Sequence, residues 1–189
     1  MENIKNLTTQ KLQEEITNED LRNLKIIISA LNIGVLLFFA VCLFLYFSGD
    51  QQEIPKPVDI ELIDTLLMLS LGLTVLMIIV SRVVPDQILR NNSKMLLADR
   101  IDEYSIVNKL LGVATTHYII KFAMLEGAAL FGLVTLILSV LNNSIHYNSV
   151  YWLAILPMLV MNFIFILTFP SKERVIQLIS DKILLQKFG

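Results

Sequence analysis

Four long apolar runs constrain this chain more than any other feature of its sequence. An α-helix rises 1.5 Å per residue, so roughly 20 residues cross a hydrocarbon core of about 30 Å. The runs match this length and cover residues 26–47, 62–84, 122–141 and 150–169. They predict an all-α fold: a polytopic membrane protein with four transmembrane helices, in contact with the lipid bilayer along each of them.

A water-soluble helical bundle is the alternative fold for such a chain. Its helices would show a polar face every 3.6 residues, and residues 33–47 show none. The chain is 55% hydrophobic and only 17% charged, which is more apolar than the core of a soluble domain of this size requires. The excess apolar surface therefore has to face lipid.

The orientation follows from the basic residues, because short loops rich in Lys and Arg stay on the cytoplasmic side. The two loops at residues 48–61 and 142–149 contain one basic residue between them, Lys56. We expect these loops outside, and both chain ends and the central link in the cytoplasm. The basic residues on that side are Lys5, Lys11, Arg22, Lys25, Arg82, Arg90, Lys94, Arg100, Lys109, Lys172, Arg174, Lys182 and Lys187.

The first run starts after a charged stretch of 25 residues and is longer than the apolar part of a signal peptide. We therefore expect this helix to remain in the mature protein. No internal repeat is visible, and we expect a single membrane domain over residues 1–189.

We expect helical cytoplasmic extensions in that domain. An N-terminal helix over residues 1–25 carries Thr17 or Asn18 as a possible cap for the helix that enters the membrane. Pro85 should close the second run and begin a link over residues 85–114. The third helix should start inside that link, since few helix breakers follow residue 102, and continue to residue 141.

The tail at residues 171–189 is predicted to be an amphipathic helix that begins after the Pro170 and Ser171 pair. Val175, Ile176 and Ile179 share one of its faces with Ile183. This apolar face fits two arrangements equally well: the tail lies on the inner membrane surface, or it packs on the other cytoplasmic helices.

One polar side chain in each apolar run falls in the same half of the bilayer. Glu126 places a carboxylate in a stretch otherwise free of charge, where an unpaired ion is costly. Counted inward from the cytoplasmic ends, Asn32, Arg82 and Asn162 lie at a similar depth. We expect the four to form an interhelical polar cluster, with Arg82 as the charge partner of Glu126.

Small residues near Glu126 predict close helix packing. Ala123 with Gly127, and Ala128 with Gly132, are pairs spaced four residues apart, as in helices that approach closely in membranes. We expect all four to lie against another helix.

Several chemical classes are not expected. The single cysteine, Cys42, cannot form an intrachain disulfide, and with His117 and His146 far apart no metal site is predicted. No nucleophile with a neighbouring base, phosphate loop or basic nucleic-acid patch is recognisable. We therefore expect that the chain is not an enzyme, uses no cofactor and binds no nucleic acid. We expect His117 to be solvated.

The segment FAMLEGAALFGLVTLILS, residues 122–139, resembles the carboxylate helix of rotary ATP synthase ring subunits. Together with Phe169, Pro170, Ser171 and Arg174, it also resembles uncharacterised small four-helix bacterial integral membrane proteins. The latter resemblance implies a multi-pass protein of the bacterial cytoplasmic (inner) membrane and no particular activity.

Two functions fit these features. The first is a non-enzymatic four-helix module, a small subunit or self-assembling scaffold that forms a homo-oligomer or joins other membrane subunits. The second is a proton- or cation-coupled carrier or channel that uses Glu126, with Asn32, Arg82 and Asn162 lining a hydrated cavity.

Overall fold

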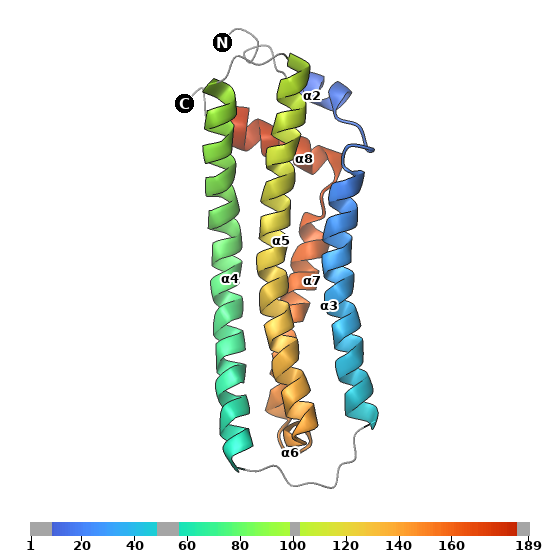
Figure 1. The fold of residues 1–189 in the computed structure, drawn as a ribbon, viewed down its shortest axis with the longest axis vertical. Coiled ribbons are helices and arrows are strands. Elements are labelled where there is room, and N and C mark those ends of the chain that lie inside the picture. Colours follow the sequence, from blue (N-terminus) through green and yellow to red (C-terminus); the bar gives the residue numbers. More distant parts are fainter. Residues whose placement is uncertain (1–8, 49–56, 99–102, 185–189) are drawn as a thin grey trace. The chain divides into compact units, whose positions relative to one another are not determined.

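The computed structural model describes residues 9–48, 57–98 and 103–184, and all the regular structure in this part is helical (Figure 1). Four of its helical segments are long and apolar enough to cross a membrane: Arg22–Ser48, Ile60–Asn92, Ile106–Leu141 and Ser149–Thr168. The predicted all-α fold with four candidate spans is therefore confirmed. In chain order the elements are α2 (Thr9–Glu15), α3 (Arg22–Ser48), α4 (Pro57–Ala98), α5 (Glu103–Leu141), α6 (Ser144–Tyr147), η1 (Ser149–Ile155), α7 (Leu156–Thr168), α8 (Lys172–Ile179) and η2 (Ser180–Leu184).

Two of these helices are much longer than a bilayer requires. Helix α4 has 42 residues and α5 has 39, which correspond to about 63 Å and 58 Å at 1.5 Å per residue. The scarcity of breakers after residue 102 anticipates the early start of α5. Each helix therefore contains residues outside the hydrocarbon core as well as its span.

The prediction that Pro85 ends the second helix is wrong, because α4 continues through it to Ala98. A proline removes one N–H from the helix ladder, but in a membrane protein neighbouring helices and side chains can offset that loss. Pro85 is buried, and the preceding turn contains Ser81, whose hydroxyl donates to the backbone oxygen of Ile78 at 3.1 Å. The helix therefore continues across a proline that is buried in the protein.

One helix was expected over residues 1–25, of which residues 1–8 lie outside the described part; from Thr9 onward the structure has helix α2, a turn and the start of α3. Helix α2 ends at Glu15, and a turn leads into α3. Thr17 stabilises this turn together with Asp20: the Thr17 N–H and hydroxyl donate to the Asp20 carboxylate at 2.8 and 2.7 Å, and the Asp20 N–H donates back at 3.3 Å. The expected cap at Thr17 is therefore present, in a reciprocal form.

The fourth span is not a uniform α-helix. It opens as the 3₁₀ helix η1, where the Asn148 side chain accepts from the Val150 N–H at 3.0 Å, and it changes to α-helix at Leu156. Pro157 lies in the first turn of α7, a position where proline is common.

The chain divides into two compact units. Unit 1 comprises Met1–Ile28, Arg82–Lys121 and Phe169–Gly189, and unit 2 comprises Ser29–Ser81 and Phe122–Thr168. Unit 2 exposes large apolar side chains, among them Phe44 at 68% and Met68 at 74%, as expected for a surface that faces lipid.

Unit 1 has an apolar core of its own, drawn from segments far apart in the sequence. Its fully buried side chains include Leu12, Leu24, Leu89, Leu110, Val175 and Ile179. Helix α8 packs against α2, and the Lys172 ammonium donates to the Gln13 backbone oxygen at 2.7 Å. Of the two arrangements predicted for the tail, the structure has the packed one, since the apolar face of α8 is buried on neighbouring helices. Ile183 has no described side chain.

Candidate functional site

Two of the four predicted intramembrane polar residues contact each other in unit 2. The Asn32 amide donates to the Asn162 side-chain oxygen at 3.2 Å, and the Asn162 amide donates to the Met158 backbone oxygen at 3.0 Å. Asn32 is buried, and its own side-chain oxygen has no hydrogen-bond partner. This pair links α3 to α7, as buried amides in apolar surroundings are expected to do.

Glu126 is half-buried on α5, in the same unit as this pair. Within the described part of unit 2, no hydrogen bond or ion pair joins it to Asn32 or Asn162. Arg82 is exposed and belongs to unit 1. Of the expected cluster, the structure shows the asparagine pair, and the pairing of Arg82 with Glu126 stays a prediction.

The four small residues of α5 divide into two kinds. Ala128 and Gly132 are buried, and a Cβ added to Gly132 would lie 2.7 Å from the Ala154 backbone oxygen. Ala123 and Gly127 are exposed, and a Cβ at Gly127 would meet nothing within 4 Å. Close approach of a neighbouring helix therefore occurs along the second pair.

Elsewhere in unit 2, one aromatic side chain contacts a carboxylate, and other aromatic rings pack on one another. The Tyr151 hydroxyl donates to Asp64 at 2.8 Å, although Tyr151 is only 2% exposed. The ring of Tyr46 stacks on His146 and meets Trp152 edge to face. Such amphipathic rings are typical of a membrane interface.

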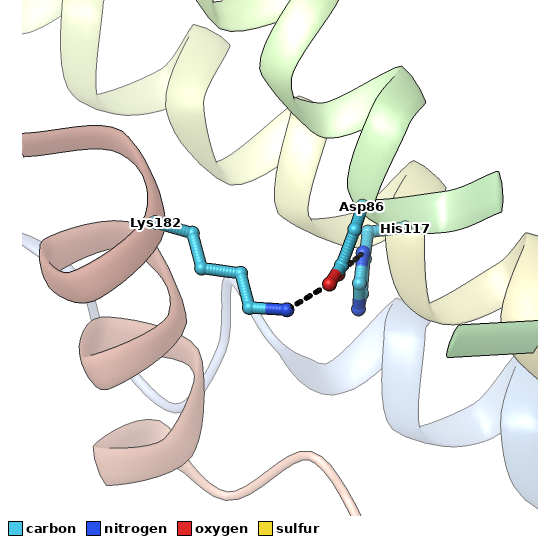
Figure 2. Close-up of polar contacts among 3 residues, drawn as sticks. All are labelled: Asp86, His117 and Lys182. Carbon is cyan, nitrogen blue, oxygen red and sulfur yellow. Dashed lines mark hydrogen bonds and ion pairs between the residues drawn. The ribbon is translucent and has the colours of Figure 1, made fainter. Parts of the chain in front are cut away.

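An unexpected polar cluster lies in unit 1 and is formed by Asp86 of α4, His117 of α5 and Lys182 of η2. The Lys182 ammonium forms an ion pair with one carboxylate oxygen of Asp86, and His117 Nδ1 lies 3.6 Å from the other (Figure 2). We refer to these three residues as the Asp86 cluster. It ties the end of the tail to the extensions of two long helices.

His117 is 7% exposed, and the expectation that it is solvated is wrong. Other segments of unit 1 cover His117 on α5. Nδ1 is buried without a hydrogen bond, because the Asp86 oxygen is just beyond hydrogen-bonding distance. The imidazole is therefore held beside a carboxylate while one of its nitrogens is unsatisfied.

Other charged residues of unit 1 act on Lys121 of α5. Lys121 is repelled by the positive charges of Arg82, Lys182 and Arg174 and attracted by the negative charge of Asp86. Arg174 is fixed by a hydrogen bond from its guanidinium to the Phe169 backbone oxygen at 3.2 Å.

The helical spacing of the sequence contains a signal for this arrangement. Arg82 and Asp86 are four residues apart on α4, and His117 and Lys121 are four apart on α5, so each pair shares a helix face. What the spacing does not reveal is that the two faces meet. Among the described residues there is no group of three His, Cys, Asp or Glu side chains that could hold a metal ion.

Comparison of the chain with protein-family models, with curated proteins and with solved structures gives no match.

Proposed function

We propose that this chain is a non-enzymatic membrane module, a small subunit or self-assembling scaffold of the cytoplasmic membrane, whose unit 1 binds a partner. The observation that supports it is the separate core of unit 1. Segments before the first span, between the second and third spans, and after the fourth span are packed together there. An assembly of this kind offers a rigid surface beside the membrane, which favours binding over chemistry.

The second candidate is a carrier or channel that couples to protons or cations through Glu126. A half-buried carboxylate in an apolar helix favours it, because intramembrane carboxylates often mark ion pathways. The close packing around Ala128 and Gly132 on the same helix favours the first candidate.

Two measurements on the full-length protein separate these functions. The first is flux of H⁺, Na⁺ and K⁺ in proteoliposomes, for the wild type and for Glu126→Gln. A scaffold gives the flux of empty liposomes in both cases. Flux that the wild type carries and Glu126→Gln loses would reject the scaffold in favour of the carrier.

The second measurement is photo-crosslinking in cells from Gln177, which is exposed on α8, with Phe163, exposed on the fourth span, as the control position. We expect a protein adduct of defined mass from Gln177, either with a second copy or with another subunit. If Gln177 gives only the lipid adducts found for Phe163, unit 1 has no protein partner.

A further inference from the structure

His117 is the member of the Asp86 cluster whose side-chain type changes charge near neutral pH, and it has no role in the proposed scaffold. The imidazole is 7% exposed, and its Nδ1 has no hydrogen-bond partner among the described residues. An Asp86 carboxylate oxygen lies 3.6 Å from this nitrogen. Charge-assisted hydrogen bonds of this kind are about 2.8 Å long, so a shift of about 0.8 Å would turn the approach into a bond.

Charged groups from α4, η2 and α5 act on the imidazole. Asp86 favours a proton on it, whereas Lys182 of η2 and Lys121 of α5 oppose that proton. The ring of Tyr118 packs edge to face on the imidazole at a centroid distance of 5.7 Å, and a phenol is uncharged at neutral pH. Asp86 can balance one of the positive charges beside it at a time, and it pairs with Lys182 when His117 is neutral.

The two groups that compete for Asp86 differ in their exposure to water. The Lys182 side chain is 37% exposed and belongs to the short helix η2, whereas His117 is buried on α5. A buried charge without a counter-ion is far more costly than a charge in water. Once His117 has gained a proton, the free energy is therefore lower when Lys182 moves into water and Asp86 pairs with the imidazolium.

We propose that the Asp86 cluster is a pH-sensitive latch, in which a proton on His117 exchanges the partner of Asp86 and releases η2. Figure 2 shows the carboxylate between Lys182 and His117. At neutral pH the carboxylate pairs with Lys182 and holds the tail. At acid pH a proton from the solvent converts His117 to an imidazolium that bonds to Asp86, and Lys182 becomes hydrated. The buried part of the cluster is neutral in both states, so neither state leaves an ion buried alone.

The latch goes beyond the proposed scaffold and needs no protein partner, because Asp86, His117 and Lys182 all lie in unit 1 of one chain. Its failure is therefore distinguishable from failure of the scaffold, which is tested by crosslinks from Gln177. If unit 1 binds a partner through the tail, the latch makes that binding sensitive to pH.

The test is backbone hydrogen exchange over residues 172–184 of the full-length protein, compared at about pH 7.5 and about pH 5.5. Carboxylates of ordinary pKa stay ionised over this range, and histidines titrate. Division by the intrinsic exchange rate at each pH gives the protection of the tail. We expect protection in the wild type to fall about fivefold on acidification, the factor for losing a partly exposed ion pair. The midpoint of this fall should coincide with the titration of His117 followed by NMR.

His117→Gln keeps a polar side chain but cannot gain a proton, so its protection should be equal at the two pH values. His146→Gln is the matched control, since His146 is the other histidine of the chain and belongs to unit 2. It should show the same fall as the wild type. Asp86→Asn removes the shared carboxylate, so its protection should be low at both pH values.

Constant protection in the wild type while His117 titrates would reject the latch. So would a fall that persists in His117→Gln, a rise in protection on acidification, or a His117 that takes up no proton above about pH 5. If His117→Gln folds poorly, Asp86→Asn decides the question. Loss of the pH dependence in Asp86→Asn supports the latch, and the same fivefold fall as in the wild type rejects it.

Discussion

Gly132 of α5 lies directly against Pro157 of α7, so that a Cβ at position 132 would be 2.8 Å from the Pro157 Cγ. The same Cβ would be 2.7 Å from the backbone oxygen of Ala154, which cannot rotate away. The small residue is therefore needed where the third and fourth spans meet, at the end of the 3₁₀ segment.

We expect Gly132→Ala to destabilise the protein by about 1–3 kcal/mol, since the added methyl group overpacks this contact. Gly127→Ala is the matched control on the same helix, where the new methyl group meets nothing within 4 Å. Its better helix propensity should leave the protein unchanged or more stable by up to about 1 kcal/mol. Unfolding in detergent, followed by the fluorescence of Trp152, measures both. Equal stability of the two variants would contradict the packing described.

The Asn32–Asn162 hydrogen bond should stabilise unit 2 by about 0.5–1.5 kcal/mol, the range found for such bonds within membranes. A double-mutant cycle with Asn32→Ala and Asn162→Ala measures it in the same unfolding assay. The single variants should each lose stability, and the double variant should lose less than their sum. Additive losses would show that the two amides do not interact.

Thr17 should hold the pKa of the Asp20 carboxyl below its usual value of 3.8, mainly through its backbone N–H and also through its hydroxyl. The stabilisation of the turn is then fully present above pH 3.8 and is lost as the pH falls through the lowered pKa. Asp20 is solvent-exposed, so its contribution stays below about 1 kcal/mol. Titration of Asp20 by NMR checks the direction, and Thr17→Val should raise the pKa toward the usual value. A pKa of 3.8 or more in the wild type would contradict the cap.

Asp86→Asn should loosen the attachment of the tail, because it removes the charge that Lys182 pairs with. Both side chains are partly exposed, at 37% for Lys182 and 30% for Asp86, so the expected cost is about 1 kcal/mol. Backbone hydrogen exchange over residues 172–184 should become faster. Asp181→Asn, one residue from Lys182, is the control and should leave the exchange unchanged. Unchanged exchange in Asp86→Asn would show that the ion pair does not hold the tail.

Much of the fold could be predicted from local patterns. Uniform apolar runs define the spans. A hydroxyl residue just before the polar first turn of a helix defines the caps at Thr17 and Ser171. The Ser171 side chain accepts from the Arg174 N–H at 3.3 Å. The passage of α4 through Pro85 could not be predicted in this way, because it depends on packing around the proline that the sequence does not display.

The candidate sites depend on which helix faces meet, and this is where prediction was weakest. The pairs Ala123 with Gly127 and Ala128 with Gly132 are five residues apart along α5, or about 140° around the helix. They could not both face the same neighbour, and only the tertiary packing selects the second pair. Asp86, His117 and Lys182 come from three distant segments, so no local spacing brings them together.

The membrane topology is the central claim, and site-directed labelling tests it most directly. Single cysteines are placed at Asn143, between the third and fourth spans, and at the exposed Asn18, Asn91 and Gln177 of unit 1, in a Cys42→Ser background. A membrane-impermeant maleimide is then applied to intact cells. The basic flanks predict that only Asn143→Cys is labelled from outside, and that the other three react only after the membrane is opened. Labelling of any of the three in intact cells, with Asn143→Cys protected, would contradict the topology.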